Sequence, residues 1–359
     1  MEGTPERADL PPAGEEMPRI YLTRRAIIAL GLFVASALAL FYFVVPRLAG
    51  AGKTWDRLDR GDPAWLGVAV ALELVSFVSY VALFRAVFIR GETRVGWRES
   101  YQITMAGLAA TRLFAAAGAG GIALTAWALR RSGMATRVVA VRMIAFNALL
   151  YTVYMVALVV IGIGLRVGLL EGGAPFGITV IPAAFGAAIL ILMSVLSALP
   201  AGFERRLQRQ DRRSSRFAKL LARAASVPVS VAEGTRAAIR LVRTRDPALL
   251  GAIGWWGFDI ATLWASFHAF GHAPPWAVII MGYFVGMLAN VLPFPGGIGG
   301  IEGGMIGAFL AFGVSGSLAL VAVITYRAFA FWLPTIPGAI AYLQLRRTVR
   351  HWRRDPAVA

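Results

Sequence analysis

Charged side chains inside long apolar stretches are the residues of clearest chemical interest in this 359-residue chain. A charge near the centre of a membrane-spanning helix costs at least ~2.5 kcal/mol on insertion scales, so such a group is expected to be paired or functional. Arg85 and Arg142 lie near predicted helix ends, from which a long side chain can reach the membrane surface. The five charges that remain are the candidates for chemistry within the membrane: Glu73, Arg112, Asp259, Glu302 and Arg327.

The two arginines of this group suit a lipid phosphate. A guanidinium group offers a rigid fork of donors that matches phosphate oxygens, so Arg112 and Arg327 are candidate substrate ligands. They could instead form an internal ion-pair network with the three carboxylates, which would make all five charges structural. Asn290 and Tyr326 could add neutral hydrogen bonds to such a site.

A run of proline and glycine precedes Glu302. Residues 293–300 are Pro-Phe-Pro-Gly-Gly-Ile-Gly-Gly, and the four glycines are Gly296, Gly297, Gly299 and Gly300. Proline removes a backbone donor and glycine loses backbone entropy in a helix, so the chain is predicted to leave the helix here. Glu302 would then lie in the first turn of the next helix, where the helix dipole favours an anion. We expect it to cap this helix, to act as a midplane carboxylate that pairs with a cation, or to do both.

The elements that position these residues are predicted to be membrane-spanning helices. Hydrophobic residues make up 58% of the chain against 15% charged residues, which is more apolar than a soluble domain. Six apolar runs approach or exceed the ~20 residues that a helix needs to cross a bilayer. They are residues 26–45, 64–88, 138–165, 176–199, 249–270 and 318–343. The sequence therefore predicts an all-α polytopic membrane protein with about six full spans.

Two further apolar segments are broken by glycine. Residues 103–129 contain Ala-Gly-Ala-Gly-Gly at 117–121, and residues 276–312 contain the break before Glu302. Non-helical backbone at membrane depth survives only inside protein or beside a wet cavity, so both segments are predicted to be re-entrant hairpins. The alternative is a tight surface loop between two spans. Five small residues of the first break match the second at an offset of 179, which favours an inverted repeat with a substrate site between its halves.

Arginine placement gives the predicted orientation. The 36 Lys and Arg against 19 Asp and Glu concentrate in loops and tails, which is the positive-inside pattern. We therefore predict a disordered cytoplasmic tail over residues 1–19, a transmembrane domain over residues 20–347 with a basic cytoplasmic loop at 201–247, and a short cytoplasmic tail over residues 348–359. The loop is expected to include amphipathic helix on the inner leaflet, with a solvated linker as the alternative. Anionic lipids of the cell (inner) membrane, rather than nucleic acid, are the expected counter-charge.

Catalytic motifs are absent from the sequence. There is no Walker motif, no Gly-x-Ser-x-Gly and no His-Glu-x-x-His. The chain has no cysteine and only three scattered histidines, so we expect neither a metal nor another cofactor. These observations favour a transporter rather than an enzyme.

The segment 290–302, followed by Tyr326-Arg327 and by Phe-Trp-Leu-Pro at 331–334, resembles a flippase-like family typified by the transmembrane region of lysylphosphatidylglycerol synthase. The resemblance implies a membrane domain that moves a phospholipid or a related modified lipid between leaflets. It also implies a carboxylate after the first break, where this chain has Ala123. The soluble aminoacyl-transferase domain of those synthases has no counterpart here, so we do not expect this chain to make such a lipid itself.

The leading hypothesis is therefore a lipid translocase with a midplane site formed by the two broken segments. The alternative is a non-transporting membrane partner of a lipid-modifying or glycosyl-transferring enzyme, with the basic loop as the docking surface. Either protein could form a homo-oligomer.

Overall fold

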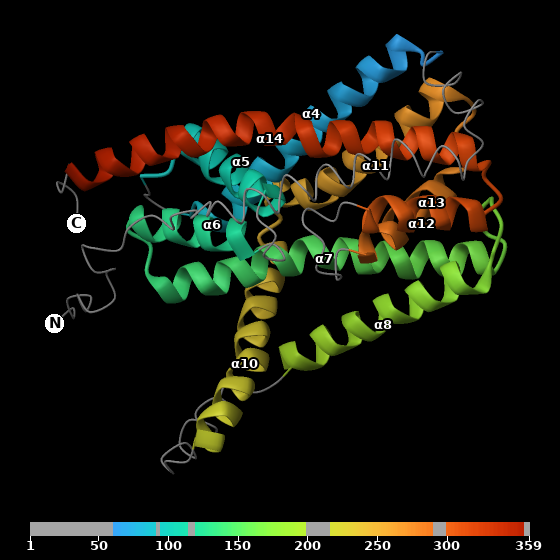
Figure 1. Ribbon diagram of the computed structural model, residues 1–359. Coiled ribbons are helices and arrows are strands. Elements are labelled where there is room, and N and C mark those ends of the chain that lie inside the picture. Colours follow the sequence, from blue (N-terminus) through green and yellow to red (C-terminus); the bar gives the residue numbers. More distant parts are fainter. Residues whose placement is uncertain (1–59, 91–93, 114–118, 199–215, 290–298, 355–359) are drawn as a thin grey trace.

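The computed structural model describes residues 60–90, 94–113, 119–198, 216–289 and 299–354 (Figure 1). Helices make up all the secondary structure of this described part. In chain order they are α4 Pro63–Phe88, α5 Trp97–Leu113, α6 Ala119–Arg131, α7 Thr136–Arg166, α8 Phe176–Ala198, α10 Arg216–Arg243, the 3₁₀ helix η3 Pro247–Leu250, α11 Gly251–Phe270, α12 Trp276–Leu288, α13 Gly300–Ala311 and α14 Gly316–Arg354.

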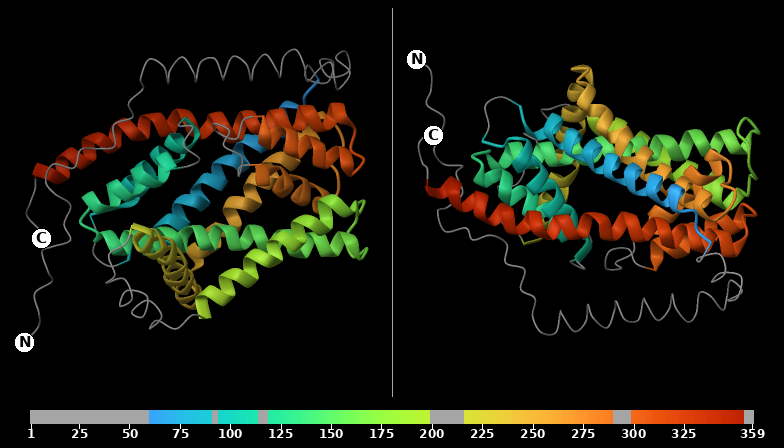
Figure 2. Two further views of the ribbon diagram at one scale, coloured as in Figure 1. Left: turned by 60° about the horizontal axis from the view of Figure 1, so that its bottom comes forward. Right: turned by 90° about the horizontal axis from the view of Figure 1, so that it is seen from above.

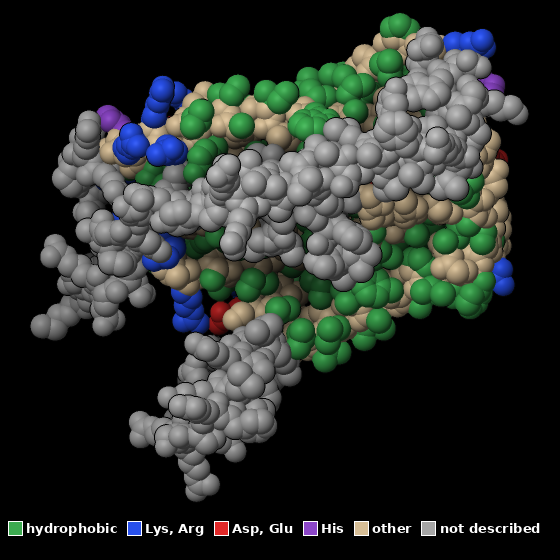
Figure 3. Space-filling view, in the orientation of Figure 1, with side chains coloured by type: hydrophobic (Ala, Val, Ile, Leu, Met, Phe, Trp, Pro, Cys, Tyr) green, Lys and Arg blue, Asp and Glu red, His purple; other side chains and the backbone are tan. Residues whose placement is uncertain are grey.

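Five helical stretches of the described residues are long and apolar enough to cross a membrane. They are α4, α7, α8, η3 together with α11, and α14. Five of the six predicted runs thus form such helices, and the run at 26–45 lies outside the described residues. Where described residues are visible in Figure 3, hydrophobic side chains are spread between the two ends of the bundle, and Lys and Arg lie at these ends, most of them where α14 terminates. This distribution suits a bilayer core flanked by polar surfaces.

The central pair α4 and α11 is antiparallel and lies between α14 and α7 (Figures 1 and 2). Both helical stretches begin with Asp-Pro-Ala-x-Leu-Gly, and each aspartate accepts a hydrogen bond from a backbone N–H two residues on, at 2.8 Å for Asp62 and 2.9 Å for Asp246. Polar bonds join the pair at intervals of seven residues: Asp62 N to Ala269 O at 2.9 Å, Thr262 Oγ1 to Ala69 O at 3.4 Å, and Ser76 Oγ to Trp255 O at 2.9 Å. The regular register of these bonds fixes the first half of α4 against α11.

Two helical hairpins, α5–α6 and α12–α13, flank this pair. Their four helices have 17, 13, 13 and 12 residues, which is about 18–25 Å at 1.5 Å per residue, against the ~30 Å of a bilayer core. Glycines let each hairpin close. A Cβ on Gly121 would clash with Gly107 O and Thr111 Oγ1, and a Cβ on Gly286 would lie 2.8 Å from Met305 N. The loop that joins each pair lies outside the described residues.

Each hairpin packs against the long helix of the other half of the chain. Gly338 of α14 packs closely on α5, since a Cβ at this position would lie 2.5 Å from Met105 O. Nearby, Gln102 Oε1 of α5 accepts a hydrogen bond from Thr348 Oγ1 of α14 at 2.9 Å. In α12, Phe284 O accepts a bond from Tyr154 of α7 at 2.5 Å. The two halves of the chain are therefore interlocked.

The helices of the first half recur in the second half in the same order. Counterpart helices begin 179 to 184 residues apart: Pro63 and Pro247, Trp97 and Trp276, Ala119 and Gly300, Thr136 and Gly316. The first pair is antiparallel, as its bonds show, and α7 and α14 run in opposite directions in Figure 1. Only α8 and α10, between the halves, have no counterpart in the described chain.

Helix α10 leaves the bundle at a steep angle to the long helices (Figures 1 and 2). Its C-terminal part packs on α7, where Gly234 contacts Ile144 and Ala238 lies in a small cluster with Ala145 and Ala148. The basic loop thus contains a helix over residues 216–243, as predicted. Its position on the inner leaflet stays a prediction.

Two links that contain no Lys or Arg, and that the positive-inside pattern therefore predicts to face outward, lie at one end of the bundle. The links at 167–175 and 271–275 adjoin, since Gly172 contacts Val278 at the start of α12. At the other end Arg90 lies 3.8 Å from Asp246, and Arg94 donates to Trp352 O at 3.5 Å. Which end is cytoplasmic stays a prediction.

Candidate functional site

Glu302 is the third residue of α13 and is held by both of its carboxylate oxygens. Gly299 precedes the helix with φ +85°, a conformation that favours glycine, and its N–H donates to Glu302 Oε2 at 2.6 Å. The carboxylate thus satisfies an N–H at the helix start, where the dipole favours negative charge. The hydrogen bond to Oε2 confirms the prediction that Glu302 caps this helix.

The other oxygen of Glu302 faces a cation from the next helix. Arg327 Nε of α14 donates to Glu302 Oε1 at 2.7 Å, with side-chain exposures of 11% and 6%. The guanidinium also lies 5.9 Å from the ring centre of Phe331. Two charges taken out of water attract strongly but lose hydration, so such a pair adds little net stability while the loss of one partner is costly.

A second polar cluster surrounds Asp259 of α11. Its Oδ2 accepts hydrogen bonds from Tyr326 at 3.0 Å and from Tyr283 of α12. Both tyrosines are fully buried and Asp259 is 5% exposed. Their rings are 6.0 Å apart at 68°. Three helices therefore meet at one carboxylate.

Glu73 of α4 is also buried, with 1% exposure. Its carboxylate lies within electrostatic range of the phenol of Tyr326, as do Asp259 and Arg327. Because Tyr326 and Arg327 are neighbours in α14, they connect the Asp259 cluster to the Glu302 pair. Acidic groups from three helices and one arginine thus converge on a single turn of α14.

The structure brings together most of the predicted site residues that it describes. Gly299, Gly300, Glu302, Tyr326 and Arg327 lie at the contact of α13 with α14, with Asp259 and Glu73 beside them. The predicted residues Asn290, Gly296 and Gly297 lie outside the described residues. Arg112 lies in the last turn of α5, and its side chain is not among the described ones.

Sequence reasoning missed two contributors. Tyr283 was hidden in an apolar run of α12, where a tyrosine usually indicates packing. The second is Gly286, which packs against Gly304: a Cβ added at Gly304 would lie 3.1 Å from Gly286 Cα. A signal was available for the glycine, because Gly107 in the first hairpin lies 179 residues earlier, at the offset already found for the two breaks.

This arrangement defines a polytopic helical membrane protein with a buried polar interior. A family model described as lysylphosphatidylglycerol synthase TM region matches residues 27–338. The chain belongs to this family, and the resemblance inferred from the segment before Glu302 is confirmed.

The chain is also similar to proteins from Methanothermobacter thermautotrophicus that carry the name UPF0104 membrane protein. One is 22% identical over 336 residues, which covers 88% of this chain and 93% of the relative. Shorter matches are 34% identical over 91 residues and 35% identical over 86 residues, and each spans about a quarter of the relative, 26% in both cases. The long match shows that the similarity extends over nearly the whole membrane domain.

Proposed function

We propose that this protein moves a phospholipid or a related modified lipid between the two leaflets, through a site at the α13–α14 contact. The observation that carries the proposal is the buried Glu302–Arg327 pair at the N-terminus of a half-length helix. Membership of a family named for the membrane region of a lipid synthase supports a lipid as the substrate. Glu302 and Arg327 are the residues proposed to contact its headgroup, and no covalent chemistry is required.

The depth of the pair fits a midplane site. Arg327 lies eleven residues after the start of α14, or ~17 Å along the helix, about half of the ~30 Å core. Glu302 lies nine residues before the end of α13, or ~14 Å from the same end of the bundle. Snorkelling to the surface would not relieve charges at this depth, so they need each other or a polar substrate.

The matching order of helices supports an inverted repeat as the scaffold of the site. In transporters of this kind, broken segments from two halves of opposite direction enclose the substrate near the midplane. We propose that α5–α6 and α12–α13 are re-entrant hairpins of this kind. Their half-length helices, and the close glycine contacts that let each hairpin close, support this proposal.

The test is lipid movement by the purified chain in proteoliposomes. Fluorescent phosphatidylglycerol and phosphatidylcholine are placed in both leaflets, and a membrane-impermeant quencher reports exchange. We expect faster exchange than in empty vesicles for at least one lipid. The double variant Glu302→Gln/Arg327→Met should lose this activity, because it removes both charges without leaving one unpaired.

A matched control is Arg166→Gln/Glu171→Gln, which also removes one charge of each sign but at exposed positions. It should retain wild-type exchange. Wild-type rates in the Glu302/Arg327 variant would refute the assigned site. No exchange by the wild type alone would refute transport and favour the alternative, a membrane partner of a lipid-modifying enzyme.

A further inference from the structure

A pocket of about 410 Å³ lies at the arginine-rich end of the bundle, away from Glu302. It is an open pocket lined by the end of α4, the start of α7 and the last turns of α10. Four arginines from these three helices line it: Arg90, Arg137, Arg142 and Arg240. None of the four was a candidate substrate ligand in the sequence.

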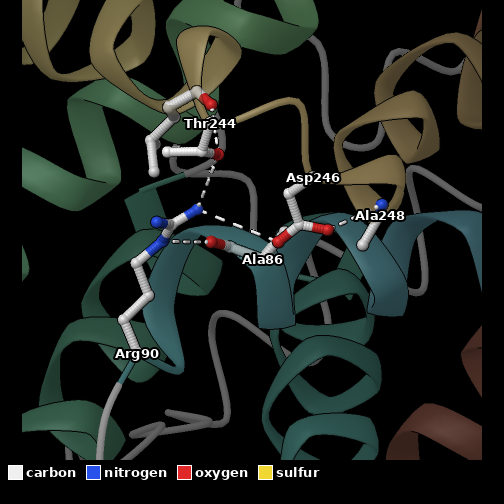
Figure 4. A network of polar contacts seen from close by, with 6 residues as sticks. Ala86, Arg90, Thr244, Asp246 and Ala248 are labelled. Atoms are coloured by element: carbon white, nitrogen blue, oxygen red, sulfur yellow. Dashed lines mark hydrogen bonds and ion pairs between the residues drawn. The ribbon is translucent and has the colours of Figure 1, made fainter.

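Local hydrogen bonds hold two of these arginines in place. Arg90 Nε donates to Ala86 O at 2.9 Å, and its Nη2 lies 3.5 Å from Thr244 Oγ1 and 3.8 Å from Asp246 Oδ2 (Figure 4). Arg142 Nη1 donates to Phe88 O at 2.6 Å, at the end of α4. The pocket is therefore built from positioned guanidinium groups.

Among the described residues, the arginines of the pocket outnumber the carboxylates that pair with them. Arg137 pairs with Glu233 at 2.9 Å, and the ion pair that Arg90 forms within the described part of the chain is the long contact to Asp246 at 3.8 Å. Among the described residues, Arg142 and Arg240 form no ion pair. The charges of Arg90 and Arg142 also repel each other. Like charges held together without a counter-charge favour a bound anion.

Apart from Thr244, the remaining residues that line the pocket are apolar. Val87, Val138, Val141 and Leu241 line it between the arginines. A small hydrated anion gains nothing from such walls, whereas the glycerol and first acyl carbons of a lipid would be removed from water. Guanidinium groups match phosphate oxygens, and basic pockets between membrane helices suit acidic headgroups.

We propose that this arginine pocket binds the phosphate group of an acidic phospholipid at the arginine-rich surface of the membrane. Arg142 and Arg240 supply the charge that the lipid neutralises, and Val138 and Leu241 contact its apolar part. The site is separate from the Glu302–Arg327 pair. The inference does not rest on the proposed transport.

Binding to the purified full-length protein in detergent tests the inference. The probes are dioctanoyl phosphatidylglycerol, dioctanoyl phosphatidylcholine and inorganic phosphate, with affinity measured by calorimetry. Phosphatidylglycerol should bind most tightly. Arg240→Gln should weaken its binding roughly tenfold, the effect of losing one charge-assisted hydrogen bond. Arg240 is exposed, so this variant keeps the fold even if Arg142→Gln does not.

The matched control is Arg243→Gln, which removes the same charge from the same helix at an exposed position that does not line the pocket. It should bind phosphatidylglycerol as the wild type does. Equal weakening in Arg243→Gln would show general attraction to a basic surface and overturn the site. Equal affinity for inorganic phosphate would overturn the lipid as its ligand, and so would equal affinity for phosphatidylcholine.

Discussion

The two helical hairpins have the same order of helices. They differ in the side chains through which each hairpin contacts the long helix that follows it in the chain. In the second hairpin, Glu302 of α13 pairs with Arg327 of α14. At the offset of 179, the counterparts in α6 and α7 are Ala123 and Ala148. The first half therefore reaches the same helix order with alanines. Because buried ion pairs are weak stabilisers, this difference teaches that the helix order itself does not require the ion pair.

A further contrast lies one residue earlier. Tyr326 donates to Asp259 on another helix, whereas its counterpart Asn147 donates to Met143 O within its own helix at 2.9 Å. At this position the second half forms a polar contact between helices, whereas the first half forms one within a single helix. Four predictions test this comparison, from the largest expected effect to the smallest.

Arg327→Met should be the most destabilising, by about 3–5 kcal/mol, because it leaves the Glu302 carboxylate buried without its cation. The double variant Glu302→Gln/Arg327→Met should recover most of this loss, since the amide can still accept from Gly299 N–H. Thermal unfolding in detergent, followed by tryptophan fluorescence, measures both. If the double variant is no more stable than the single one, the two charges are not coupled as the structure shows.

Tyr326→Phe should cost about 1.5–3 kcal/mol, the range for a hydrogen bond to a charged group. Asn147→Ala removes the counterpart and should cost less than ~1 kcal/mol, because its bond is local to one helix. The same unfolding assay compares them. A cost for Asn147→Ala as large as that for Tyr326→Phe would erase the contrast between the halves.

Gly286→Ala should destabilise by about 1–3 kcal/mol, since the new Cβ meets the backbone nitrogen of Met305 at 2.8 Å. Gly107→Ala should cost less, because the nearest atom is the hydroxyl of Thr125 at 2.9 Å, which can rotate away. Gly303→Ala is the control, with nothing within 4 Å of its Cβ. Equal effects at Gly107 and Gly303 would mean that Gly107 makes no close contact that a methyl group disturbs.

Asp62→Ala should cost about 1 kcal/mol, the value of an N-cap. Asp246→Ala removes the matching cap of η3 and α11 and also the contact with Arg90, so its cost should be slightly larger. The free energies of unfolding of the two variants are compared with an uncharged denaturant, at equal detergent concentration. A negligible effect at Asp62 would contradict the role of the shared Asp-Pro-Ala start.

Much of the fold was predictable because it depends on local composition. Runs of apolar residues formed helices of spanning length, and the offset between the two glycine breaks anticipated the matching helix order. The position of Glu302 in a first helical turn followed from the preceding prolines and glycines. Hydropathy could not give the rotation of each helix about its axis, since lipid and protein interior are equally apolar and packing decides it.

By itself, the sequence determined that the chain is a helical membrane protein, which segments break, and where a carboxylate caps a helix. These results follow from backbone hydrogen bonding in an apolar solvent, which acts over short stretches. Only the tertiary structure decided that Arg327 pairs with Glu302, that Asp259 is bound by two tyrosines, and that arginines from three helices share one pocket. Their distances depend on how the helices pack, which joins residues far apart in the chain.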